Sequence, residues 1–573
     1  MTITAVTRYP RKAGQPQRPL TLAESAIGPG GRAPAVGLWG HRRGGPADPH
    51  RPHGGDEARV PDHTEQVTTY DKILVTHSGA LRRKYGADGG DRVRDALDGL
   101  VAADSTRGIV NRVLDLDNYQ SMKAVGATRV PDGDWVATLR AVDLACTRYA
   151  PAYVALVGAT DVVPQARVDN PFAGLGDDLD PYVPSDLPFA CDLPDDGSGP
   201  LSGLDTGSGT GSLLDPADLL AMTRVVGRIP DLAGESDPAF LLDLLASATS
   251  YTQRAAGSYQ RVFALTAAAW HGSTTQSATL LPGPTPPVND SPPATSGWNK
   301  SVLAPRVHLV NCHGADTAPD WFGQLPGGPV DTVALTPEDV EGRLTDGTVV
   351  AAECCFGAMH QVPSRQSGRR PMLAAYLHSG AYAAVGSSTT SYGPADGNGQ
   401  ADLICRFFLE NVVAGFSNGR ALLEARQRFV REGGALAPED LKTLAQFDLL
   451  GDPSLHAVSL AAPKGPAVTA AVTKSARHGR RVALAATGRA LEGAVPRAGR
   501  RQRRPRMTAE RLAERAGVRT RDVGQVRSFG EHRRGPRRGN RFFLAPVRVG
   551  RRSGFVSGRE LDGVLDARVV LRK

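Results

Sequence analysis

The sequence predicts an α/β fold built on a parallel sheet, and three features of residues 70–460 predict it. Short runs of β-branched and apolar residues alternate with longer amphipathic stretches. The short runs are apolar throughout, which is typical of strands buried on both faces in a parallel sheet. No motif repeats with a period of 20–50 residues, so a solenoid is excluded.

The expected elements follow from these patterns in chain order. Residues 72–76, 109–116 and 153–157 are apolar, β-branched runs that predict strands, and the amphipathic residues 91–102 and 135–149 predict helices between them. Such a βαβαβ series implies right-handed crossovers. A second series has strands at 261–266, 306–312, 349–354 and 381–385, followed by helices at 400–413, 418–431 and 438–446. Residues 170–211 are rich in Asp, Pro, Gly and Ser, and we expect a long surface loop there.

Two strands of the second series lead into reactive side chains. Residues 306–312 are followed by His313 and Gly314, and residues 349–353 are followed by Cys354. Open α/β sheets place active sites at the edge where parallel strands end. An imidazole beside a thiol lowers the thiol pKa and protonates the leaving group. The amides of Gly314 and Cys354 would hold an oxyanion. The pattern therefore predicts a cysteine hydrolase with a dyad of His313 and Cys354.

These strand ends resemble those of the gingipain-like cysteine peptidases, which share a caspase-like fold with caspases, legumains and clostripain. In that family one apolar strand ends in His-Gly and another ends in the catalytic cysteine. Similar motifs follow the family's order over roughly residues 70–457, namely YVALVG at 153–158, DLPFACD at 186–192, VGRIP at 226–230, GAYAAVGSST at 380–389 and LLGDPSL at 449–455. The resemblance implies a caspase-like parallel-sheet α/β sandwich, preceded by an N-terminal α/β subdomain.

The adjacent cysteines leave the nucleophile open. Successive strand residues face opposite sides, so only one of the two can meet His313. The family places its nucleophile three residues before a glycine, which favours Cys354 and leaves Cys355 as second choice. We expect Cys355 to face the core. A zinc site is an alternative whose ligands would be drawn from His308, Cys312, His313, Cys354, Cys355 and His360, but these residues lack the paired spacing of structural zinc sites.

Composition indicates a soluble, multidomain chain. It has 573 residues, of which 40% are hydrophobic and 22% charged. No run of 18 apolar residues occurs, and residues 1–10 lack the apolar stretch of a signal peptide, so we expect a cytoplasmic location. The six cysteines show neither the density nor the spacing of a disulfide scaffold, which fits a reducing compartment.

Charge is unevenly distributed, and with the motifs it divides the chain into four expected parts. These are a disordered Pro/Gly/Arg-rich segment at 1–68, an N-terminal α/β subdomain at 69–260, a catalytic subdomain at 261–463 and a basic extension at 464–573 that ends in a small β module. The extension contains 29 Lys and Arg against 8 Asp and Glu. It would contact nucleic acid, form a solvated appendage, or represent an out-of-frame translation of a GC-rich gene. Nucleic-acid contact is not favoured, because few aromatic residues lie among the arginines.

The sequence thus predicts a cysteine-type endopeptidase that acts on proteins or peptides through a thioester acyl-enzyme, without a cofactor, metal ion or membrane. Asp316, Trp321 and Gln324 follow the predicted catalytic histidine and are candidates to line the substrate cleft. The alternative is a catalytically inactive caspase-like protein that binds a partner, including nucleic acid through its basic tail.

Overall fold

The computed structural model describes residues 69–459 and 509–572, apart from gaps at 175–177, 194–199, 202–203, 205–212, 361–367, 395–396, 434–435, 525, 531–540, 550–551 and 562–563. The segment 1–68 and the basic residues 464–508 lie outside the described residues, as does part of the loop expected at 170–211. The fold is mixed α/β with a large, mostly parallel central sheet.

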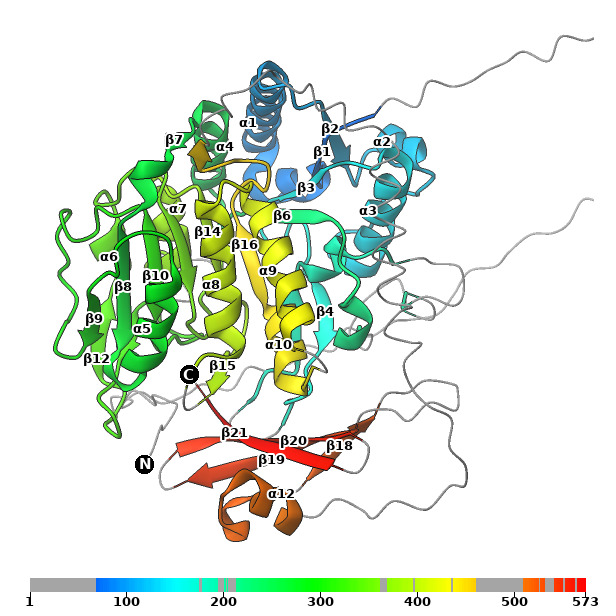
Figure 1. Ribbon diagram of the computed structural model, residues 1–573. Helices are drawn as coiled ribbons and strands as arrows, with labels where there is room; N and C mark the ends of the chain where they lie inside the picture. Colours follow the sequence, from blue (N-terminus) through cyan, green and yellow to red (C-terminus); the bar gives the residue numbers. More distant parts are fainter. Residues whose placement is uncertain are drawn as a thin grey trace, which may run out of the picture. The chain divides into compact units, whose positions relative to one another are not determined.

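Among the described residues, ten strands from both halves of the chain form this central sheet (Figure 1). Eight of the nine neighbouring pairs are parallel, and the exception is the antiparallel pair of β14 with β16. The order is β2 (Asn111–Asp115), β1 (Lys72–Thr76), β3 (Tyr153–Val157), β6 (Val225–Ile229), β16 (Phe447–Leu450), β14 (Ala383–Ser387), β13 (Val349–Ala352), β10 (Val307–Asn311), β8 (Val262–Ala267) and β9 (Val288–Ser291).

The two predicted strand series are joined within this sheet. Strand β3 of the N-terminal series pairs in parallel with β6, and β6 pairs in parallel with β16, where Arg228 lies opposite Leu450. Strand β16 then pairs with β14 of the second series. Strands from both sides of residue 260 therefore belong to one continuous sheet.

Helices cover the sheet on its faces. In Figure 1, α8, α9 and α10 lie side by side in front of the central strands, and α8 packs on β13 and β10. Helices α1, α4 and α7 pack in series against one another. The bounds are α1 (Ser78–Thr106), α2 (Tyr119–Val125), α3 (Trp135–Tyr149), α4 (Ala239–Ser250), α5 (His271–Leu280), α6 (Pro337–Val340), α7 (Met372–His378), α8 (Gln400–Val413), α9 (Asn418–Gly433) and α10 (Pro438–Gln446).

Burial explains why the central strands were recognisable. Every residue of β10 and β13 is buried, as expected for strands covered on both faces. Helices α3, α8 and α10 have the bounds predicted from their apolar periodicity. Strand β13 ends at Ala352, two residues before its predicted end, because the chain turns sharply after Glu353.

The expectation of a surface loop at 170–211 is wrong for its described first part. Strand β5 (Tyr182–Ser185) and the short helix η1 (Leu187–Ala190) are packed into the protein, and Phe189 is fully buried. Acidic residues here are buried because basic residues pair with them. Asp186 forms a 2.6 Å ion pair with Arg228. Composition indicated solvent contact, but it could not reveal these partners.

The C-terminal described residues have an apolar cluster of their own. Strands β18 (Arg527–Gly530), β19 (Arg541–Val549), β20 (Arg552–Leu561) and β21 (Val564–Arg572) pair antiparallel in that order, and helix α12 (Ala509–Ala516) packs on β20 and β21. Strand β21 also pairs with β15 (Tyr392–Pro394). Across the part of the chain that the structure describes, no helix has the length and apolar character needed to cross a membrane.

Candidate active site

His313 lies just beyond the end of β10 and is held by its main chain and its ring. Its backbone exchanges two hydrogen bonds with Phe322, with N···O distances of 2.8 and 2.9 Å. The imidazole Nε2 lies 3.1 Å from Oε1 of Gln324. The ring of Trp270, which follows the neighbouring strand β8, packs against it with a centroid distance of 4.4 Å. The histidine is therefore fixed on several sides and is only 8% exposed.

Cys354 faces the core. Its side chain is 0% exposed and belongs to the main hydrophobic cluster. Burial raises the pKa of the Cys354 thiol well above its usual range, and the neighbouring Cys312 thiol raises it further. Burial also raises the pKa of Cys312. These two thiols stay protonated and act as small buried apolar groups.

Cys355 lies on the other side of the chain, next to a loop from β14. The backbone N–H of Ser391 donates to the Cys355 sulfur at 3.3 Å, and the Ser391 hydroxyl lies 3.8 Å from the same sulfur. Both cysteines are buried, at 0% and 3% exposure, but only Cys354 belongs to the main hydrophobic cluster, whereas we expected Cys355 to be the one that faces the core.

A tight turn presents Cys355. The N–H of Gly357 donates to the carbonyl of Cys354 at 3.1 Å, so Cys355 occupies the second position of a four-residue turn. Phe356, in the third position, has φ of 55°. This left-handed conformation is costly for a residue with a bulky side chain. Such strain concentrates at functional sites, where the surrounding structure enforces it. Here the Phe356 N–H is bonded to the carbonyl of Thr389 at 2.9 Å.

The two strand ends place His313 and Cys355 in matching positions. The ladder of β10 and β13 pairs Val307 with Val349 and continues in that register to Val310 and Ala352. His313 follows Val310 by three residues, and Cys355 follows Ala352 by three residues. The main chain agrees, because a Cβ atom on Gly314 would lie only 1.9 Å from the carbonyl oxygen of Cys355.

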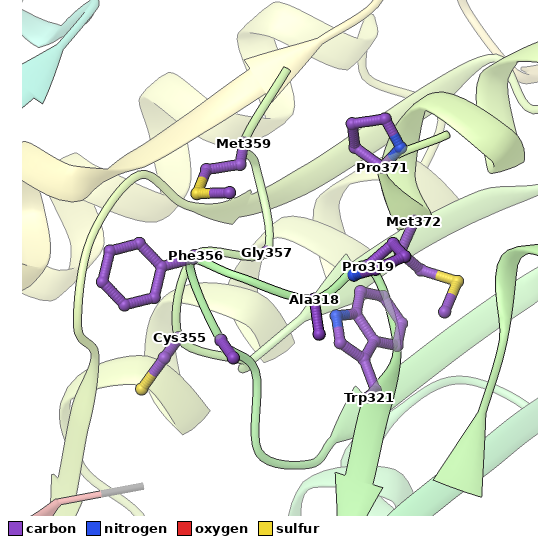
Figure 2. Close-up of a pocket in the computed structure, with 10 residues that line it drawn as sticks. Ala318, Pro319, Trp321, Cys355, Phe356, Gly357, Met359, Pro371 and Met372 are labelled. Atoms are coloured by element: carbon purple, nitrogen blue, oxygen red, sulfur yellow. The ribbon is translucent and has the colours of Figure 1, made fainter. Parts of the chain in front are cut away.

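A pocket opens beside the turn and beside the loop that follows His313. Figure 2 shows Cys355 and Phe356 on one side of it and Trp321 and Met372 on the other, with the cysteine sulfur directed away from Trp321. The described lining residues are mostly apolar: Ala315, Ala318, Pro319, Trp321, Cys355, Phe356, Gly357, Met359, Pro371 and Met372.

Asp316, Trp321 and Gln324, which we expected to line the substrate cleft, lie in three different environments. Trp321 lines the pocket, whereas Asp316 is exposed and is not part of its described lining. Gln324 contacts the imidazole of His313. The sequence assigned no role to Trp270 or Phe356, and it marked Ser391 only as the first residue of the run SYGP at 391–394, which resembles the family's loop after the nucleophile.

The six residues of the zinc alternative are not gathered at one point. His308 is fully buried, with its ring nitrogens near the Tyr376 hydroxyl and the Pro305 carbonyl. Burial lowers the pKa of both His308 and His360 to about 4. Within the described ranges, no three His, Cys, Asp or Glu side chains are grouped as metal ligands would be.

Comparisons with known proteins add little to this geometry. No protein-family model matches the sequence, and no curated protein matches it. A solved structure described as "Structure of Protease" is similar, with a TM-score of 0.40 and 14% sequence identity over 87% of this chain and 96% of that chain. At this level of similarity the match supports no argument about activity.

Proposed function

We propose that this protein is a cysteine-type endopeptidase of the gingipain-like, caspase-like kind, in which His313 and Cys355 form the catalytic dyad. The observation that carries the proposal is the placement of these two residues at matching positions beyond the ends of β10 and β13. The edge of a parallel sheet where strands end is the usual place for such a site.

The choice of Cys355 over Cys354 rests on their surroundings. The thiolate is the form of cysteine that attacks carbonyl carbon. Cys354 is enclosed by apolar side chains that oppose ionisation, whereas Cys355 receives the Ser391 N–H and borders the pocket. The strained Phe356 immediately after Cys355 also marks the second cysteine as the presented one.

In the proposed reaction His313 takes the proton of the Cys355 thiol, and the thiolate sulfur attacks the scissile carbonyl. The amides of Gly314 and Cys355 stabilise the oxyanion, so the amide of Cys355 replaces that of Cys354 in the role we expected. The imidazolium then protonates the leaving amine as the peptide C–N bond breaks. Water attacks the resulting thioester and releases the acid product and the thiol.

The test is covalent labelling of the full-length protein. A set of peptidyl acyloxymethyl ketones with basic, acidic and apolar P1 residues would be applied, and the modified residue located by mass spectrometry. We expect labelling at Cys355 and cleavage of a diverse peptide pool. Cys355→Ala should abolish both, whereas Cys354→Ala should retain both and lower the melting temperature.

Each other outcome has a distinct meaning. Labelling that follows Cys354 would overturn the assignment of the nucleophile. The absence of labelling by every probe, with intact folding, would overturn the peptidase proposal and favour the alternative of an inactive binding protein.

A further inference from the structure

Gln324 is buried beside the proposed catalytic histidine, and both ends of its side-chain amide have partners. Its Oε1 lies 3.1 Å from Nε2 of His313, and its Nε2 lies 2.8 Å from the carbonyl oxygen of Gly328. The residue is 1% exposed. A buried amide at this position can only be satisfied by these fixed neighbours.

The backbone of Gln324 is fixed as well. Its N–H donates to the carbonyl of Ser291 at 2.9 Å, and its carbonyl accepts from the N–H of Ala269 at 2.8 Å. Ser291 ends β9, and Ala269 follows β8, so the two neighbouring strand ends hold Gln324 in place. The side chain therefore reaches His313 from a rigid base.

These contacts determine which atom of the amide faces the histidine. The carbonyl of Gly328 only accepts hydrogen bonds, so the amide NH₂ group must point to it. The other end, Oε1, is an acceptor and faces His313. A neutral imidazole bonded to an acceptor through Nε2 must carry its proton there, which leaves Nδ1 as the basic nitrogen.

We propose that Gln324 is a positioning residue that fixes the tautomer and orientation of His313, so that Nδ1 takes the proton of the Cys355 thiol. This inference rests on the proposed peptidase function. The proton moves from Sγ to Nδ1 and gives a thiolate and an imidazolium. The Gln324 oxygen accepts from the Nε2–H in both states and stabilises the cation. The ring of Trp270 packs against the imidazole and limits its rotation.

The pH dependence of peptide cleavage tests this role. Gln324→Met keeps the length of the side chain but removes the acceptor, so kcat should fall by on the order of 100-fold with little change in KM. The alkaline limb of the kcat/KM profile should move to lower pH, because the imidazolium loses its stabilising acceptor. Gln324→Glu should move the same limb to higher pH. A merely structural role predicts no such opposite shifts. Leu325→Ala, at the adjacent exposed position, is the matched control.

A spectroscopic arm separates this inference from the peptidase proposal. In the Cys355→Ala background at pH 8, protein labelled with ¹⁵N-histidine would be compared with the same protein carrying His313→Gln. We expect Nε2 of His313 to be protonated and Nδ1 to be unprotonated, and Gln324→Met should give a mixture of tautomers. A proton on Nδ1, or a spectrum that Gln324→Met leaves unchanged, would overturn the inference. If His313 has the expected tautomer but the wild-type protein cleaves no peptide, only the peptidase proposal is overturned.

Discussion

The main chain of Gly314 lies against the main chain of Cys355, so closely that a Cβ atom on the glycine would be 1.9 Å from the cysteine carbonyl oxygen. Real Cβ atoms do not approach a carbonyl oxygen to that distance, and the glycine is therefore a steric requirement. The contact joins the two loops that carry His313 and Cys355.

Gly314→Ala should push these loops apart. Alanine keeps the backbone N–H, but the shifted loop would carry that donor away from the oxyanion. Loss of one oxyanion donor typically costs a factor of about 100 to 1,000 in kcat, so we expect kcat/KM to fall by at least about 100-fold. Gly272→Ala is the matched control, because Gly272 also follows a histidine but has open space around it. This control should keep full activity. Equal activity of Gly314→Ala and the wild type would contradict the close approach.

A buried lysine ties the first strand to the LLGDPSL motif. The Lys72 ammonium lies 2.8 Å from Asp452 and 2.5 Å from Asp104, and all three side chains are almost completely buried. These carboxylates hold the pKa of Lys72 above its usual value against the effect of burial, and the ammonium holds the pKa of Asp452 below its own. Lys72→Met should lower the free energy of unfolding by about 3–5 kcal/mol, because it leaves the buried Asp452 without its cation and Asp104 with Arg107 alone. Chemical denaturation would measure this.

The control for that prediction is Arg82→Met, which breaks an exposed pair with Asp91. Solvent screens exposed charges, so this variant should unfold at the wild-type denaturant concentration. A Lys72→Met protein as stable as the control would show that the buried cluster is not a structural tie.

The burial of His308 should lower the free energy of unfolding in mild acid. Burial lowers its folded pKa to about 4, whereas its ordinary value is 6.5. Its contribution to stability is therefore fully present above pH 6.5 and is lost as the pH falls toward 4, because only the unfolded chain takes up the proton. The difference corresponds to about 3 kcal/mol as an upper bound. His308→Gln should flatten the decline in unfolding free energy between pH 6.5 and 4, as chemical denaturation across that range would measure.

The sequence predicted the positions of the helices and strands better than it predicted which way the side chains point at the strand ends. Strong periodicity placed β10 and α8 to within a residue at each bound, because burial imposes that periodicity. The orientation of Cys354 and Cys355 depended on the register between two strands that are far apart in the sequence. That register pairs residues 42 apart, as Val307 with Val349, whereas the spacing that we read from His313 to Cys354 is one shorter. A one-residue difference exchanges the faces of a strand.

Other parts of the site had no local signal. The contact of Gln324 with His313 requires the hairpin of β11 (Trp321–Gly323) and β12 (Thr332–Leu335) to fold back on the strand ends. The positive φ of Phe356 is imposed by its surroundings, since an aromatic residue does not favour that conformation. Tertiary contacts decide both features.

The basic extension should be dispensable for the central sheet and its site. The apolar cluster of residues 512–569 is separate from the main cluster, which ends at Val458. Removal of β21 would expose the edge of β15, but Tyr392 of that strand would keep its 2.6 Å hydrogen bond to Asp178 and its stacking on Phe172. A chain ending at Pro463 should therefore be folded, melt near the temperature of the full-length protein and be labelled at Cys355 at a similar rate. If the truncated protein is folded but is labelled slowly, the β15–β21 pair supports the loop that carries Ser391. If it is unfolded, the extension belongs to the core and the expected boundary at 463 is wrong.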